Sequence, residues 1–78
     1  QVNFIQEFNN TLIVGTGDEN GTAKIYVSAD GESFSLAGAL PGKHATSCHV
    51  FGDILYIGVS DPVGKVYSYN GSVFSEVF

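Results

Sequence analysis

The sequence predicts an all-β protein, and three observations carry this prediction. Short runs rich in β-branched and aromatic residues alternate with turn-forming pairs such as Asp30-Gly31 and Asn70-Gly71 along the 78 residues. No window places apolar residues at helical spacing over three turns. Short motifs recur after about 40 residues, a typical length for one four-stranded repeat.

The first half of the chain is expected to form four strands, because turn residues divide it into four apolar runs. Asn9-Asn10 marks the first turn. The next two turns are marked by residues 17–21, which are rich in Gly and acidic residues, and by Asp30-Gly31. Tight turns of this kind join antiparallel neighbours. The expected strands are residues 2–8, 11–16, 23–28 and 34–37.

After Pro41-Gly42, the second half of the chain shows the same alternation of apolar runs and turn residues. Gly52-Asp53 and Asn70-Gly71 are turn pairs, and the segment 61–64 contains Pro and Gly. The expected strands are residues 47–51, 54–59, 65–69 and 73–78.

The two halves are copies of one unit. The offset between matching motifs is 43 residues at the second strand, 41 at the third strand and 40 at the last turn. Changes in loop length cost little, so a drifting offset is compatible with one repeated unit. We therefore divide the chain into residues 1–43 and 44–78. The matching segments are 12–15 with 55–58, 24–26 with 65–67, and 28–35 with 68–75.

A four-stranded antiparallel unit with this period is typical of a β-propeller blade. Propellers contain about four to eight blades, so two blades would leave apolar faces in water. We expect identical chains to close the ring by head-to-tail contacts, with six blades from three chains favoured. Two alternatives stay open: a single eight-stranded sandwich or barrel, and a part of a longer single-chain propeller.

Residues 26–34 resemble the Asp-box turn of sialidase-like propellers, in which Ser-x-Asp is followed by Gly and then an aromatic residue. Residues 68–74 look like a degenerate second copy. Both are one residue shorter than the usual motif, and Phe stands where Trp is typical. The resemblance implies a structural turn on the rim of each blade and no catalytic role. The turn residues would be Ser28, Asp30 and Gly31 in the first copy, and Ser68, Asn70 and Gly71 in the second.

A weaker similarity is to integrin-type (FG-GAP) blades, in which Leu-Ile-Val-Gly is followed by a loop and a strand of the type Gly-x-Val-Tyr-Val-Tyr. The strands at 11–16 and 54–59, with those that follow them, are similar to this pattern. Asn9-Asn10 and Gly52-Asp53 stand where that family has an acidic calcium loop. Calcium is therefore not implied.

Composition limits the function. With 3 basic and 8 acidic residues the formal net charge is −5, and there is no Arg. Such a chain is poorly suited to the phosphates of nucleic acids or to anionic membrane surfaces, and we expect neither partner. Its apolar runs are too short for a membrane span. The single Cys48 allows no internal disulfide.

We expect no catalytic residues, no cofactor and no metal site. The chain has no Gly-x-Ser-x-Gly elbow and none of the arginines that a sialidase needs for its substrate carboxylate. Cys48 and His49 are adjacent on a strand, so they point to opposite faces. The acidic segment 18–21 lacks the spacing of a good calcium loop. In a ring, three His49 imidazoles would surround the axis, but a polar residue facing channel water is the simpler interpretation.

The candidate ligand-binding residues are Tyr69, Tyr67, Tyr26 and His49. Tyrosine rings stack on sugars or peptides at low entropic cost, although packing between blades is the competing role for each ring. Tyr69 is expected to be the most exposed, because it lies beside a turn.

The sequence therefore predicts a non-enzymatic binding or scaffolding module that is completed by self-association. A lectin-like module for carbohydrate is its concrete version, since repeated blades offer several equivalent weak sites, and a peptide is the other ligand considered. The alternatives are a part of a larger sialidase-like enzyme and an excised or engineered pair of blades without a ligand. We expect an extracellular location; three Asn-x-Ser/Thr triplets, at Asn9, Asn20 and Asn70, would be glycosylation acceptors only in a secretory pathway, and turn composition alone produces such triplets.

Overall fold

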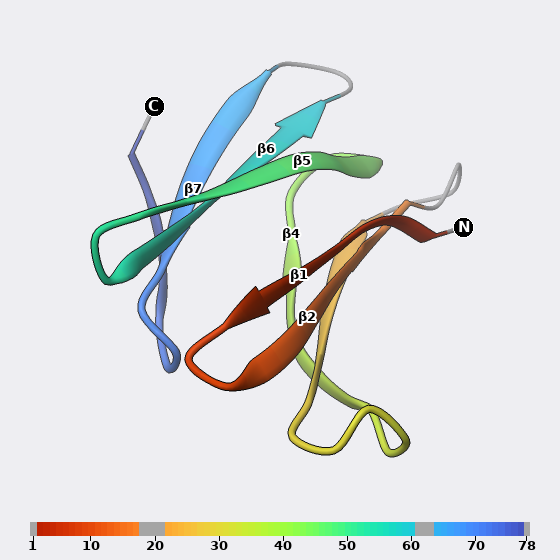
Figure 1. Cartoon of the computed structure of the whole chain (residues 1–78). Helices are drawn as coiled ribbons and strands as arrows, with labels where there is room; N and C mark the ends of the chain where they lie inside the picture. The colour runs from red at the N-terminus through yellow and green to blue at the C-terminus, as the bar shows by residue number, and fades with distance from the viewer. Residues whose placement is uncertain (1, 18–21, 61–63, 78) are drawn as a thin grey trace.

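The computed structural model describes residues 2–17, 22–60 and 64–77, which form two four-stranded antiparallel β-sheets (Figure 1). The predicted all-β class and the two antiparallel sheets are confirmed, and the described residues contain no helix. The first sheet contains β1 (Val2–Phe8), β2 (Thr11–Thr16), β3 (Ala23–Ser28) and β4 (Ser35–Leu40). The second contains β5 (His44–Phe51), β6 (Ile54–Ser60), β7 (Lys65–Tyr69) and β8 (Phe74–Glu76).

Each sheet is a meander whose strands lie in chain order. The connection 41–43 leads from β4, at one edge of the first sheet, to β5, at an edge of the second. β5 packs chiefly against β1, so the first strands of the two sheets are neighbours (Figure 1). The two sheets are therefore stacked on each other and are not joined into one continuous sheet.

Four strands differ from the prediction. β4 covers residues 35–40 instead of 34–37, β5 begins at His44 instead of residue 47, β6 ends at Ser60 instead of residue 59, and β8 is limited to residues 74–76 instead of 73–78. The extension of β4 runs through Gly38 and Ala39, which have low β propensity. It forms because Ala23 pairs with Leu40 and the Ala23 N–H donates to the Gly42 carbonyl at 2.7 Å. Pairing with β3 thus overrides local propensity.

Alternation along β2 and β6 gives each sheet two faces. We name those of the first sheet the Ile13 face and the Val14 face, and those of the second sheet the Tyr56 face and the Ile57 face. The Ile13 face packs on the Ile57 face, and both naming residues are at most 1% exposed. The core between the two faces consists of Phe8, Ile13, Ala23, Ile25, Leu40, Ala45, Leu55, Ile57, Val59, Tyr67 and Tyr69.

The two sheets repeat each other in detail. β1 has an irregularity beside Phe4, and β5 has one beside Ser47, 43 residues later. Each of these residues covers a glycine of the adjacent strand. A Cβ added to Gly15 would overlap the Phe4 ring, and one added to Gly58 would lie 2.8 Å from the Ser47 hydroxyl. Both glycines therefore make room for a side chain from the first strand of their own sheet.

Candidate binding site

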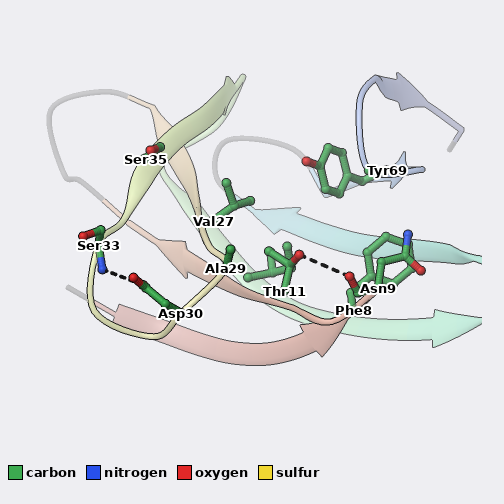
Figure 2. Close-up of a pocket in the computed structure, with 11 residues that line it drawn as sticks. Phe8, Asn9, Thr11, Val27, Ala29, Asp30, Ser33, Ser35 and Tyr69 are labelled. Carbon is green, nitrogen blue, oxygen red and sulfur yellow. Dashed lines mark hydrogen bonds between the residues drawn. The ribbon is translucent and has the colours of Figure 1, made fainter.

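A cleft opens between the two sheets at the end where β1, β3 and β7 finish (Figure 2). Its volume is about 510 Å³, within the ~300–1,000 Å³ that is usual for small-molecule sites. Its floor includes the buried side chains of Phe8, Ile13 and Tyr69. Its rim is formed by exposed or half-exposed polar residues of the first sheet: Asn9, Thr11, Asp30, Ser33 and Ser35.

Asp30 organises the turn between β3 and β4 on this rim. Its Oδ1 accepts hydrogen bonds from the Ser28 hydroxyl at 3.1 Å and from the backbone N–H groups of Glu32 at 2.8 Å and Ser33 at 3.0 Å. Gly31 adopts φ = 80°, and its N–H donates to the Ser28 hydroxyl at 2.8 Å. Bonding from the N–H of Ser33, then from that of Glu32, lowers the pKa of Asp30. The carboxylate is thus held ionised as part of the turn.

Asn70 has the same place in the turn between β7 and β8. Its Oδ1 accepts hydrogen bonds from the N–H groups of Ser72 and Val73, both at 2.9 Å. Gly71 follows with φ = 105°, a left-handed conformation that suits glycine. An amide oxygen therefore makes the same two backbone bonds in the second repeat that a carboxylate makes in the first.

Ser68 lies outside this turn, which corrects its match with Ser28. In the first sheet Ser28 pairs with Leu12, whereas in the second sheet the counterpart Leu55 pairs with Tyr69. Tyr69 therefore occupies the strand position of Ser28, and the second turn is one residue shorter. The Ser68 hydroxyl donates instead to a backbone carbonyl of β8 at 3.5 Å.

The turn between β1 and β2 forms the other part of the rim. Asn9 and Asn10 have φ values of 53° and 61°, the two positive angles of a type I′ hairpin turn. The Thr11 hydroxyl donates to the Asn9 carbonyl at 3.2 Å. The Asn9 side chain also approaches the second sheet, because a Cβ added to Gly71 would lie 3.5 Å from its Nδ2. Asn9 thus lies at the mouth of the cleft between the sheets.

Tyr69 and Tyr67 are buried on the Ile57 face, each 6% exposed. The expectation that Tyr69 is the most exposed tyrosine is therefore wrong. Its ring stacks on Phe74 with centroids 4.3 Å apart and tilts against Phe8 with centroids 6.2 Å apart. Packing between the sheets places Tyr69 at the floor of the cleft, where its hydroxyl is turned toward the first sheet (Figure 2).

Tyr26 and His49 lie on the two faces that are not covered within the chain. Tyr26 is half-buried on the Val14 face, since it pairs with Val14. His49 is exposed on the Tyr56 face, where it pairs with Tyr56. Neither residue lines the cleft. The four candidate binding residues are therefore not brought together into one site.

Within residues 2–17, 22–60 and 64–77, no group of three or more His, Cys, Asp or Glu is placed to hold a metal ion. Cys48 is half-buried, its thiol donates to Gln6 Oε1 at 3.8 Å, and burial raises its pKa. The segment 18–21, considered for calcium, lies outside the described residues.

Comparison with known proteins yields no relative: no protein family, no curated protein and no solved structure matches the chain. A search of the described residues finds no helix long and apolar enough to cross a membrane. What the chain does must therefore be inferred from its two sheets and from the cleft between them.

Proposed function

We propose that the chain is a non-enzymatic binding or scaffolding module whose copies associate into a closed ring of β-propeller blades. One observation carries the proposal. The two faces left uncovered in a single chain are the repeat counterparts of the two faces that pack together inside it.

The sequence repeat relates the covered faces to the uncovered ones. Ile13 corresponds to Tyr56, and Val14 corresponds to Ile57, in both cases 43 residues later. The Tyr56 face is therefore a second version of the Ile13 face, and the Val14 face is a second version of the Ile57 face. One copy can place its Val14 face against the Tyr56 face of another, as the two sheets pack within each chain.

The exposure of apolar side chains supports this arrangement. Phe51 is 73% exposed on the Tyr56 face, whereas its counterpart Phe8 is 4% exposed between the sheets. On the Val14 face, Ile5 is 62% and Leu36 is 55% exposed. Large apolar patches on soluble proteins usually mark an interaction surface. Apolar residues of the two faces are Ile5, Leu12, Val14, Tyr26 and Leu36 on one, and Phe51, Ile54, Tyr56 and Val66 on the other.

Contact between two unlike faces is head-to-tail, and it repeats until the rotation closes a ring. Three chains with two blades each would make six blades, within the known range of about four to eight. A longer single-chain propeller would cover the same faces with further repeats. A free-standing eight-stranded sandwich would leave both faces bare.

The ligand of such a module would lie between blades, and a lectin-like activity is its concrete version. Each chain contributes a cleft, so a ring of three chains offers three equivalent weak sites and binds multivalent ligands by avidity. A non-enzymatic role is supported by the cleft itself. Among its described lining residues Asp30 is the one carboxylate and is engaged in a turn, and no Lys, His or Cys lines the cleft to act with it.

Absolute mass by light scattering after size exclusion, across a tenfold dilution, tests the assembly. A stable mass of three chains is expected. Ile5→Lys, on the Val14 face, should reduce it to one chain, whereas Val73→Lys, in an exposed turn outside both faces, should not. A single chain that unfolds cooperatively would support the sandwich, and an ill-defined aggregate would support the longer chain. Either result would overturn the proposal.

A further inference from the structure

We infer that the cleft between the two sheets binds a small, uncharged saccharide, and that each chain carries one such site instead of one per blade. This inference rests on the proposed binding function and specifies its site and its ligand class.

The polar rim of the cleft is where the two repeats differ. Thr11 corresponds to Ile54, Ser33 corresponds to Val73, and the position of Asn9 is occupied by a glycine in the second repeat. The second hairpin and turn fold with the apolar set, so the fold does not require the polar side chains. The framework, by contrast, is the same in both repeats: Phe before the hairpin turn, and a side-chain acceptor followed by Gly in the last turn.

The same comparison sets the number of sites. A cleft formed between two chains of a ring would have the rim of the second repeat, with Ile54 and Val73 in place of two hydroxyls. Its opposite wall would carry Ser28 of the next copy in place of Tyr69, because these two residues share a strand position. Such a cleft has fewer hydrogen-bonding groups and no tyrosine floor. Only the cleft within each chain is built for a polar ligand.

The chemistry of this cleft suits a saccharide. Its rim offers the hydroxyls of Thr11, Ser33 and Ser35, and its floor contains the rings of Phe8 and Tyr69. A pyranose presents the complementary combination, with hydroxyls around its edge and C–H groups on its faces, which pack on apolar and aromatic surfaces. Hydrogen bonds from the rim would fix its orientation, as the few polar groups of small-molecule sites do.

The charge of the cleft selects against anions. Among the described lining residues Asp30 is the one carboxylate, and neither Lys nor His occurs. Oδ1 of Asp30 accepts the three hydrogen bonds that organise the turn, and the residue is exposed. Its carboxylate can thus also accept a hydrogen bond from a sugar hydroxyl. A sialylated or phosphorylated ligand would meet a negative charge with no cation to offset it.

Titration of the ¹⁵N-labelled chain with neutral methyl glycosides (galactoside, glucoside, mannoside and N-acetylglucosaminide), followed by amide chemical shifts, tests the inference. At least one glycoside should saturate at one site per chain with an affinity of about millimolar. The shifts should centre on the amides of Asn9, Thr11 and Ser33. N-acetylneuraminic acid, the anionic probe, should produce none there. Absence of saturable shifts with every neutral glycoside, or shifts centred on another surface, would overturn the inference.

The repeat supplies matched variants. Thr11→Ile with Ser33→Val gives the cleft the residues that the second repeat already carries, and it should weaken binding at least tenfold. Val73→Ser alone makes the reverse exchange away from the cleft and outside both association faces, and it should leave the affinity of the cleft unchanged. Ser33→Val alone, at an exposed position, serves if the double variant does not fold. Unchanged affinity in a folded cleft variant would refute the site. Light scattering on the same samples separates this failure from a failure of assembly.

Discussion

Phe51→Ala is the substitution that separates assembly from folding. Phe51 is 73% exposed in a single chain, whereas its counterpart Phe8 is 4% exposed between the sheets. If the Tyr56 face packs in the assembly as the Ile13 face packs in the chain, Phe51 loses about two thirds of its surface, or ~140 Å² of the ~200 Å² that an aromatic side chain buries. At ~25 cal/mol per Å², this burial contributes about 3.5 kcal/mol per contact. Truncation should therefore weaken association about 400-fold.

Light scattering across a tenfold dilution measures the loss of assembly. Urea unfolding of the dilute chain measures its own stability, which should change by less than about 0.5 kcal/mol because the side chain is exposed. Phe8→Ala is the matched control: the same residue type at the same repeat position, but buried, so it should cost about 3–5 kcal/mol of unfolding free energy. If Phe51→Ala keeps the wild-type mass on dilution, or destabilises the chain as much as Phe8→Ala, the proposed equivalence of the faces is wrong.

Three further predictions concern the chain itself. Gly15→Ala should lower the free energy of unfolding, measured in urea, by about 1–3 kcal/mol, because the new methyl group overlaps the Phe4 ring. Gly58→Ala should lower it by less, because its methyl group meets a serine hydroxyl that can rotate. Equal losses in the two variants would contradict this. Since the pKa of Asp30 is lowered below its ordinary 3.8, its stabilising effect is complete above that value and is lost as the pH falls through the folded pKa. Wild type should therefore lose more stability than Asp30→Asn below about pH 4, as measured by urea unfolding at several pH values, and parallel losses would count against this role. Cys48 should react with thiol reagents more slowly in the folded chain than in urea, because burial raises its pKa, and equal rates would contradict its placement.

The hairpins were predictable because their signals are local. Asn9-Asn10 and Asn70-Gly71 lie between apolar runs, and the backbone takes positive φ at Asn9, Asn10 and Gly71. The repeat was equally readable, since its strongest motif falls on the central strand of each sheet. The ends of β4 were not predictable, because Gly38-Ala39 becomes a strand only through its pairing with β3.

The packing of the faces was beyond local signals. Leu12, Ile13 and Val14 are consecutive and all apolar, so the alternation of side chains along the strand does not show which face of the sheet is covered. The place of Tyr69 was missed for a related reason. Residue identity in the turn aligned Ser28 with Ser68. Only the strand pairing shows that Tyr69, on the covered face of the second sheet, is the residue that corresponds to Ser28. The cleft likewise joins turns that are far apart in the chain.

Assembly and ligand binding, as proposed, use different residues of the same two sheets. A repeated unit with two unlike faces packs head-to-tail on its neighbour, and a copy of the pair inherits the same unlike faces, so the contact within the chain prescribes the contact between chains. The rim of the cleft lies outside those faces, and it is there that the two repeats diverge in polarity. A substitution at Phe51 should therefore remove avidity while each cleft keeps its affinity for a single glycoside. A substitution at Ser33 should do the opposite, leaving the ring intact with empty clefts.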